Sequence, residues 1–294
     1  KFKESLNELA DPIIILTSGE NNSLAASMEI LSYLKLNGRK GLILHGNEEE
    51  MAARLKNMMQ AQKAWINLQG MKLGQVGAPS SWLISSDVDA KKLKEVSGME
   101  IVNISMEEFY EEINKHSYED NEYTLDLKKH EFDKDELEKA LEIYGALCRL
   151  KDKYGLGAMT VRCFDLLEPY KNTGCLGLAI LNAQGIYAGC EGDMQSLISM
   201  VILGEVSSQP VFMCNPSRIN SKDNDIILAH CTLPVNMPTK YCLMTHYESG
   251  LGVALRGHIA EGDATIFKCS KDLSRHFLEK GEITKNLEEE ALCR

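Results

Sequence analysis

Short apolar runs alternate with stretches of helical periodicity through the first half of the chain, and this alternation limits the fold more than any other feature. Residues 12–17 are apolar and end at Ser18-Gly19, which is typical of a buried parallel strand. Residues 24–34 then carry apolar side chains at helical spacing. The same pattern predicts further strands at 41–44, 72–76 and 99–104 and helices at 48–68, 87–96 and 106–114.

Strands that alternate with helices pair in parallel through right-handed crossovers. Residues 1–150 are therefore expected to form a Rossmann-like α/β region with a parallel sheet, either whole or as two subdomains of about 1–70 and 71–150. Within this region, residues 116–132 are polar and charged, so we expect a connector there. Asp133 follows as the expected N-cap of a helix that leads into the second half.

The second half has a different pattern, because short strand-like runs follow one another with mostly turn residues between them. One amphipathic helix is expected at 191–206. We expect residues 151–294 to form a strand-rich, barrel-like α+β domain. The expected strands are 159–164, 186–190, 211–214, 226–230, 240–246, 252–257 and 264–268.

Charge and cysteine content exclude several classes of protein. The 43 acidic and 32 basic side chains give a net charge of −11, which argues against nucleic-acid and anionic-lipid partners. No apolar run approaches the ~18 residues of a membrane span. The nine cysteines are odd in number and contain no CxxC pair, so they are expected to be mostly buried thiols in a reducing compartment. A cytoplasmic enzyme fits this composition.

Three predicted strands end in ionisable side chains that together could hold a metal. Asp165 follows the first strand, Glu191 and Asp193 follow the second, and His230 ends the third. Carboxylates and an imidazole, with water in the remaining positions, suit Mn²⁺ or Mg²⁺ better than a structural Zn²⁺. Each residue also has a simpler interpretation. Glu191 or Asp193 can cap the following helix, Asp165 can be a loop acid, and His230 can be a hydrogen-bonded core residue.

Two further segments are candidates for sugar contacts. Trp82 ends a glycine- and serine-containing loop after a predicted parallel strand, the usual position of a ligand crevice. His246 and Glu248 lie in a polar segment before two glycines. A structural βα loop and a polar hairpin are the alternatives for these segments. The sequence contains no GxGxxG, Walker or GxSxG motif, so dinucleotide, nucleotide and hydrolase functions have no motif to support them.

Several of these segments occur in one order that resembles a known group of sugar isomerases. The run Cys190-Glu191-Gly192-Asp193-Met194 is similar to the acidic segment of L-arabinose and L-fucose isomerases, with Asp165 ahead of it and a histidine segment at 225–231 behind it. The "fucose isomerase-related" branch carries patterns similar to four further segments. These are 21–26, 74–82, 245–250 and 262–267.

The resemblance implies a metal-dependent aldose–ketose isomerase that works through an enediol. It implies Mn²⁺, with Mg²⁺ or Co²⁺ as alternatives, held by Asp165, Glu191, Asp193 and His230. Asp165 and Glu191 would also be the catalytic acids and bases. The implied substrate is a sugar related to L-fucose or L-arabinose, and the implied assembly is a homo-oligomer, a trimer or a hexamer.

The sequence also departs from the family pattern. Asp165 stands where the arabinose enzymes carry a glutamate, and a last ligand histidine expected near the C-terminus is missing after Leu292-Cys293-Arg294. We therefore expect the C-terminus to be incomplete. Two other functions stay open on the sequence: a non-catalytic sugar-binding protein of the same fold, and a metal-dependent epimerase or aldolase.

Overall fold

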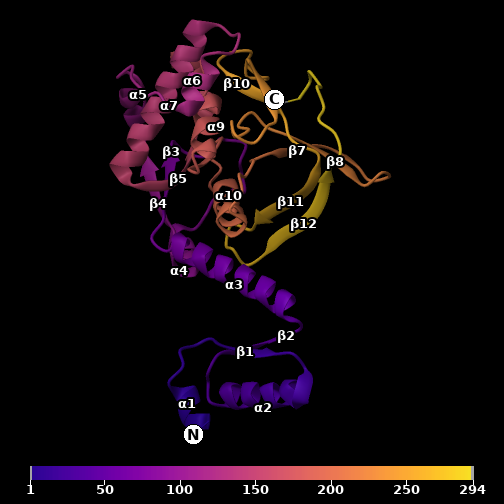
Figure 1. Ribbon diagram of the computed structural model, residues 1–294. Coiled ribbons are helices and arrows are strands. Elements are labelled where there is room, and N and C mark those ends of the chain that lie inside the picture. Colours follow the sequence, from indigo (N-terminus) through magenta and orange to yellow (C-terminus); the bar gives the residue numbers. More distant parts are fainter. Residues whose placement is uncertain (1, 293–294) are drawn as a thin grey trace. The chain divides into compact units, whose positions relative to one another are not determined.

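Helices and parallel strands alternate from the start of the fold, and antiparallel strands dominate its end (Figure 1). The computed structural model describes residues 2–292. Cys293 and Arg294, which end the C-terminus that is expected to be incomplete, lie outside the described residues. The helices are α1 (Phe2–Asn7), α2 (Ser23–Leu36), α3 (Glu48–Leu68), α4 (Ala90–Ser97), α5 (Met106–Ile113), α6 (Glu122–Leu127), α7 (Lys134–Tyr154), α8 (Leu167–Tyr170), α9 (Cys175–Ala183) and α10 (Met194–Ser207), with the short 3-10 helices η1 (Glu20–Asn22) and η2 (Cys163–Leu166). The strands are β1 (Ile13–Thr17), β2 (Gly41–His45), β3 (Lys72–Val76), β4 (Glu100–Ile104), β5 (Leu156–Val161), β6 (Tyr187–Gly189), β7 (Asn215–Asn220), β8 (Asp225–Ala229), β9 (Lys240–Met244), β10 (Ala254–His258), β11 (Gly262–Cys269) and β12 (His276–Ile283).

The chain divides into two compact units, one up to Lys63 and one from Ala64 onward. In the first unit, β1 and β2 pair in parallel from Ile13 opposite Gly41. The helix α2 packs on both strands. Leu6, Ile13 and Leu34 form the small core of this unit.

A parallel sheet in the order β4-β3-β5-β6 is the centre of the second unit. Gly74 of β3 lies opposite Val102 of β4 on one side and opposite Met159 of β5 on the other. The strands β5 and β6 come after residue 150, so the parallel sheet continues past the boundary that the sequence predicts there. It does so because the Asp133-capped α7 returns the chain to the same sheet. A domain boundary at residue 150 stays a prediction.

Helices cover both faces of this sheet. Side chains alternate across a strand, so Ala158 and Met159 of β5 point to opposite faces. Ala158 packs in one buried cluster with Leu73 of β3 and with residues of α4 and α10. Met159 belongs to the larger cluster, which holds Val76 and residues of α5, α7 and α9. Figure 1 shows α5, α7 and α9 gathered on one side of β3 and β5. The expected α/β class is confirmed.

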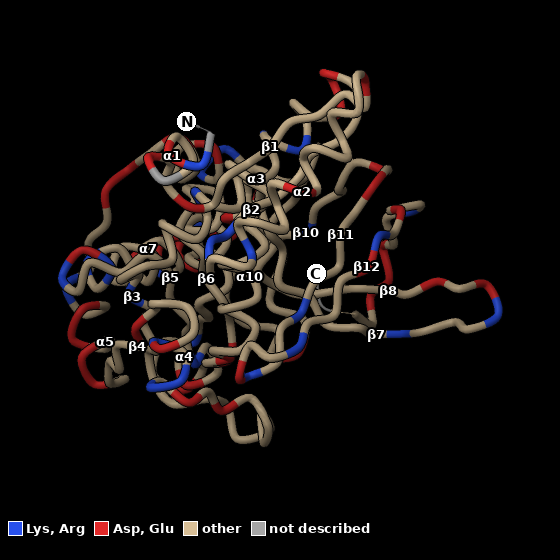
Figure 2. Tube along the Cα trace, turned by 90° about the horizontal axis from the view of Figure 1, so that it is seen from below, with Lys and Arg blue, Asp and Glu red and all other residues tan. Residues whose placement is uncertain are grey.

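The later strands form three antiparallel pairs, β7–β8, β9–β10 and β11–β12. Within residues 2–292 these pairs are separate two-stranded sheets, so the expected barrel does not close there. The reason is local, because each strand pairs with its neighbour in sequence. The β7–β8 hairpin extends away from the rest of the second unit in both views (Figures 1 and 2). Residues 211–214, predicted as a strand, are irregular, and β7 begins only at Asn215.

Charged residues of both signs are spread along the second unit. Figure 2 shows Lys and Arg segments interspersed with Asp and Glu segments along its trace.

The polar region 116–132, expected to be a connector, contains the short helix α6. Asn121 caps this helix, and its side chain accepts hydrogen bonds from Tyr123 N and Thr124 N. None of the described helices has the length and apolar character needed to cross a membrane.

Candidate active site

Three neighbouring parallel strands deliver the candidate residues to one edge of the sheet. The strand β3 leads into the loop that carries Trp82, β5 leads into Phe164 and Asp165, and β6 leads into Cys190 and Glu191. In a parallel sheet the carboxyl ends of all strands meet at one edge, where ligands usually bind. These loops therefore come together although they lie far apart in the sequence.

Glu191 is fixed in this edge by its backbone. Its φ of 63° places it in the left-handed region, which is costly for a residue with a side chain. Its carbonyl oxygen accepts a hydrogen bond of 2.9 Å from Ser80 N, and the next amide, Gly192 N, donates to Val161 O at 3.0 Å. These contacts hold the turn after β6 against the ends of β3 and β5.

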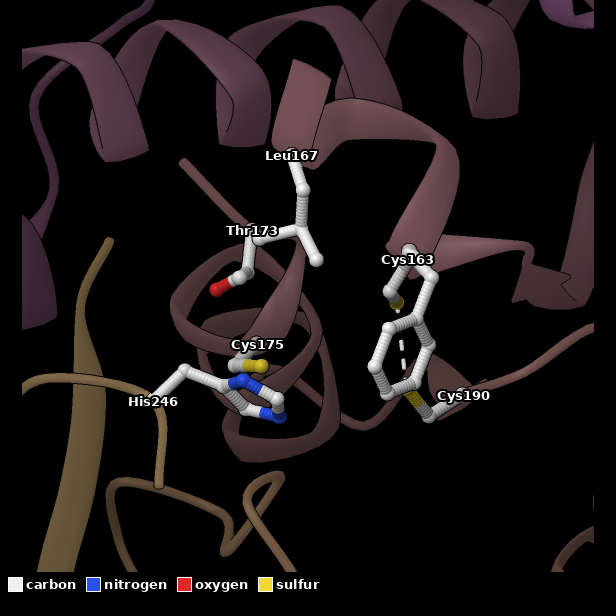
Figure 3. A pocket seen from close by; sticks show the side chains of 7 residues that line it. Cys163, Leu167, Thr173, Cys175, Cys190 and His246 are labelled. Atoms are coloured by element: carbon white, nitrogen blue, oxygen red, sulfur yellow. Dashed lines mark hydrogen bonds between the residues drawn. The ribbon is translucent and has the colours of Figure 1, made fainter. Parts of the chain in front are cut away.

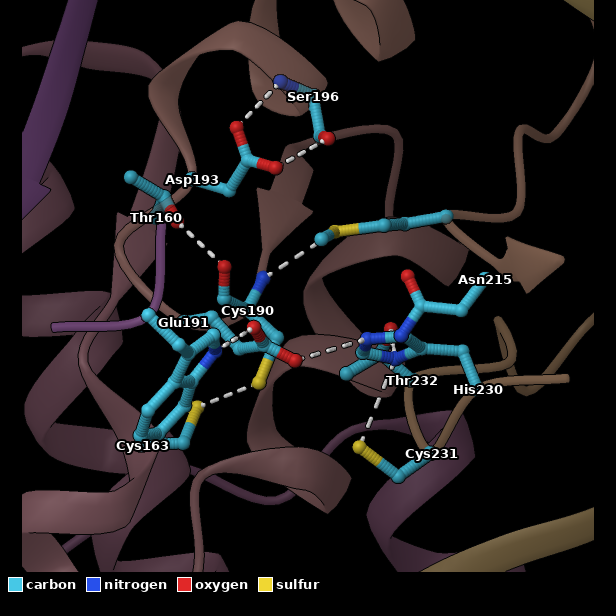
Figure 4. A network of polar contacts seen from close by, with 12 residues as sticks. Thr160, Cys163, Cys190, Glu191, Asp193, Ser196, Asn215, His230, Cys231 and Thr232 are labelled. Carbon is cyan, nitrogen blue, oxygen red and sulfur yellow. Dashed lines mark hydrogen bonds and ion pairs between the residues drawn. The ribbon is translucent and has the colours of Figure 1, made fainter. Parts of the chain in front are cut away.

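The carboxylate of Glu191 lies between an indole and an imidazole (Figure 4). Trp82 Nε1 donates a hydrogen bond to Glu191 Oε2 at 2.8 Å. His230 Nε2 lies 3.8 Å from Oε1, too far for a direct hydrogen bond but close enough for an ion pair when the ring is protonated. Thr232 Oγ1, 3.2 Å from His230 Nδ1, orients the ring from its other side. The structure therefore brings Trp82, Glu191 and His230 together, and the placement of Glu191 and His230 at strand ends predicts that these two meet.

The neighbours of Glu191 set its acidity. The adjacent His230 imidazole is the largest influence and lowers the pKa of Glu191, while burial acts in the opposite direction. The indole N–H of Trp82 and the more distant His246 lower the pKa further. The net effect is a carboxyl group with a lowered pKa, so at neutral pH Glu191 is an anion that can accept a proton or bind a cation.

An aromatic row continues from Trp82 into the site. Trp82 and Phe164 make an edge-to-face contact, with ring centroids 5.1 Å apart and an interplanar angle of 88°. Phe164 makes a similar contact with His246, at 5.6 Å and 81°. Trp82 is 53% exposed, so its ring presents apolar surface beside a carboxylate. Phe164 is not among the candidates that the sequence indicates, and its only sequence signal is its position three residues after the end of β5.

The remaining predicted residues have other surroundings. Asp165 pairs with Arg162, whose Nε lies 3.0 Å from Asp165 Oδ1. Asp193 caps α10, because its carboxylate accepts hydrogen bonds from Ser196 N at 2.8 Å and from Ser196 Oγ at 2.6 Å. Glu248 is exposed on the turn after β9.

Only part of the predicted metal set therefore fits a metal ion. Glu191 and His230 offer an oxygen and a nitrogen that face each other. The four predicted ligands Asp165, Glu191, Asp193 and His230 do not form a group within the described residues whose ligand atoms all lie within 4.8 Å of one another. Two protein ligands suit a hard cation that keeps several waters, and they do not make a closed site.

Buried thiols lie directly beneath this edge. Cys190 Sγ donates a hydrogen bond to Cys163 Sγ at 3.1 Å. The contact with Cys190, followed by burial, raises the pKa of Cys163. The expectation that most cysteines are buried is met for Cys163, Cys175, Cys190, Cys231 and Cys269, whereas Cys148 and Cys214 are partly buried and Cys242 is exposed.

Comparison with known proteins finds similarity to sulfoquinovose isomerases. No protein-family model matches the chain. The chain is 25% identical over 232 residues to a sulfoquinovose isomerase of Clostridium sp. (strain MSTE9), an alignment that covers 76% of this chain and 50% of that protein. It is 22% identical over 264 residues to sulfoquinovose isomerases of Priestia aryabhattai and Priestia megaterium (strain ATCC 12872 / QMB1551), which covers 85% of this chain and 59% of each of them. The chain thus spans little more than half the length of these curated relatives. The similarity is to sulfoquinovose isomerases, and it does not single out the fucose and arabinose enzymes.

Proposed function

We propose that this chain carries the site of an aldose–ketose isomerase, with Glu191 as the group that moves the proton between C1 and C2 of an open-chain sugar. The observation that carries the proposal is the position of the Glu191 carboxylate. It lies at the carboxyl edge of the parallel sheet, held by the Trp82 indole and facing His230. The similarity to sulfoquinovose isomerases supports the same reaction class.

The chemistry needs one base that stays close to two neighbouring carbons. Glu191, as an anion, would take the proton from C2 of the aldose to give an enediol, and the resulting carboxylic acid would return a proton to C1 to give the ketose. The hydroxyl proton must also pass from the C2 oxygen to the C1 oxygen, and an imidazole can carry it. The His230 ring, which faces Glu191, would do this. Asp165 remains the second predicted acid or base. In the structure its carboxylate pairs with Arg162.

A divalent cation fits the proposal as a partner of two residues. Mn²⁺, with Mg²⁺ or Co²⁺ as alternatives, would be held by Glu191 and His230 and would polarise the carbonyl oxygen of the sugar when bound. The exposed ring of Trp82 would stack on the apolar face of the sugar, and its N–H would keep the Glu191 carboxylate in place. His246 and Glu248 remain the further predicted sugar contacts.

The substrate is proposed from the relatives and from the sequence together. Sulfoquinovose is the first candidate because the matched curated proteins are named for it. L-fucose and L-arabinose are the alternatives that the motif resemblance implies. A homo-oligomer, a trimer or a hexamer, completes the proposal and can be tested by light scattering.

The deciding experiment follows the proton. The 294-residue chain is incubated with each of the three sugars in D₂O with Mn²⁺, and ¹H NMR records loss of the C2 proton signal and growth of ketose signals. Glu191→Gln should abolish both changes, and Glu261→Gln, an exposed acid between β10 and β11, should leave them unchanged. Sugar binding without exchange would instead support the non-catalytic alternative. Exchange at full rate in Glu191→Gln would refute the assigned base.

A further inference from the structure

Three buried side chains meet beside the proposed isomerase site, and none of them is its proposed base or a proposed ligand of its divalent cation. Cys175 is the first residue of α9, Cys231 lies two positions after β8, and His246 lies two positions after β9. Their exposed fractions are 1%, 3% and 4%. Among the described residues, these three side chains form a group whose ligand atoms lie close enough together to hold one metal ion.

The distances suit coordination. All three ligand atoms lie within 4.8 Å of one another, so some point lies within about 2.8 Å of each of them. Zinc–sulfur and zinc–nitrogen bonds are ~2.3 Å and ~2.0–2.1 Å long, so a contraction of about 0.5 Å would close the site. Side-chain rotations of buried residues can supply that contraction without a change of fold. The three ligands come from three separate segments, so the fold and not a local motif brings them together.

We propose that Cys175, Cys231 and His246 form a binding site for a thiophilic transition metal, with Zn²⁺ as the expected ion. Two thiolates and one imidazole select Zn²⁺ over the hard Mn²⁺ and Mg²⁺, which prefer oxygen ligands. Binding would release one proton from each thiol.

A small cavity lies beside two of the three proposed ligands (Figure 3). Cys175, His246 and Thr173 line this cavity, whose volume is about 10 Å³, the size of one water site. Thr173 is 2% exposed, and its Oγ1 has no hydrogen-bond partner among the described residues. A buried hydroxyl left unpaired is costly, and a metal-bound water in this cavity would pair with it.

The surroundings also orient the imidazole. Ser249 Oγ lies 3.0 Å from His246 Nδ1, and the Phe164 ring packs against the histidine at 5.6 Å. Groups of this kind fix the ring orientation of metal-binding histidines. The site would join α9 to the segments after β8 and β9. Because Cys231 directly follows His230, zinc would also fix the backbone that places His230 beside Glu191. The zinc site stands independently of the proposed isomerase reaction.

The test uses Co²⁺ as a spectroscopic substitute for Zn²⁺. The reduced, metal-free 294-residue chain is titrated with Co²⁺, and we expect sulfur-to-cobalt charge transfer in the near ultraviolet and strong visible bands of tetrahedral cobalt at one equivalent. Zn²⁺ should displace these bands stoichiometrically, whereas Mg²⁺ should not. X-ray absorption of the zinc-loaded wild-type chain should give two sulfur ligands, and this measurement needs no variant to fold.

Variants separate this site from the Glu191 site. Cys175→Ser and Cys231→Ser should each lose the charge-transfer band and at least tenfold in zinc affinity, with folding checked by circular dichroism. Cys269→Ser, which removes a buried thiol of the other core cluster, and Glu191→Gln should keep both. Absence of sulfur ligands in the zinc-loaded wild-type chain would overturn the proposal. Zinc affinity that is unchanged in both folded cysteine variants would overturn it as well.

Discussion

Trp82 Nε1 donates a 2.8 Å hydrogen bond to Glu191 Oε2 across 109 positions of the sequence. The same loop after β3 also holds the backbone of Glu191, because Ser80 N donates to Glu191 O at 2.9 Å. The strands β3 and β6 are not neighbours, since β5 lies between them. The carboxylate is therefore placed by two loops that reach over the end of a third strand.

Trp82→Phe tests how much the indole N–H contributes. The change keeps an aromatic ring near Phe164 but removes a donor that lowers the pKa of Glu191. Because a hydrogen bond to a charged group is worth about 1.5–3 kcal/mol, kcat/KM for sugar C2–H exchange should fall roughly tenfold or more. The acidic limb of the pH–rate profile should move to higher pH. Trp65→Phe, at an exposed position of α3, is the matched control. An unchanged pH profile in Trp82→Phe would count against the role of the indole.

Gly192→Ala tests the turn that carries Glu191. Gly192 has a φ of 69°, and an added Cβ would lie 2.7 Å from Ala78 O and 2.9 Å from Pro79 Cα. Gly185 has a similar φ of 81° but open space around the added atom. Both alanine variants should lose about 1–2 kcal/mol from the left-handed backbone, and Gly192→Ala should lose at least ~1 kcal/mol more because backbone must shift. Urea unfolding of the two variants measures the difference, and equal losses would show that the loops separate freely.

Asp193 distinguishes a helix cap from a metal ligand. Asp193→Ala should cost ~1 kcal/mol in urea unfolding, because the cap of α10 is lost. Asp193→Asn should stay within a few tenths of a kcal/mol of the wild type, since asparagine caps as well as aspartate. If Asp193 is a cap only, Asn will leave Mn²⁺ affinity unchanged. A large loss of Mn²⁺ affinity in the stable Asn variant would restore the predicted ligand role.

Most strands and helices could be predicted because their patterns are local, and the exceptions have physical reasons. The helix α9 has no polar face, since all of its residues from Cys175 to Ala183 are buried, so it lacks the amphipathic period. The strand β12 (His276–Ile283) is exposed along almost its whole length, so it lacks an apolar face. The meeting of Glu191 and His230 could be predicted because each residue lies at the end of a strand. The aromatic row and the meeting of Cys175, Cys231 and His246 depend on loops that pack in three dimensions, and no sequence spacing indicates them.

Glu112 gives a pH test of the second unit's stability that does not depend on function. Its carboxylate contacts Lys115 Nζ at 2.7 Å and Arg149 Nε at 2.8 Å. Burial alone would raise the pKa of Glu112, but the hydrogen bonds from these two cations outweigh it, so the pKa lies below its ordinary value of 4.5. A group with a lowered pKa in the folded state stabilises the fold above its unfolded pKa, and this contribution is lost as the pH falls through the folded value.

Glu112→Gln should therefore lower the free energy of unfolding by about 1–3 kcal/mol at neutral pH, because it leaves Arg149 without its charged partner. The gap between variant and wild type should shrink as the pH falls below 4.5, because the wild-type carboxylate then becomes protonated too. Urea unfolding at neutral pH and at several acidic pH values measures both effects. Glu111→Gln, at an exposed position of the same helix, should change stability little at any pH. A gap of constant size across this range would mean that the charge of Glu112 is not what stabilises the packing of α5 on α7.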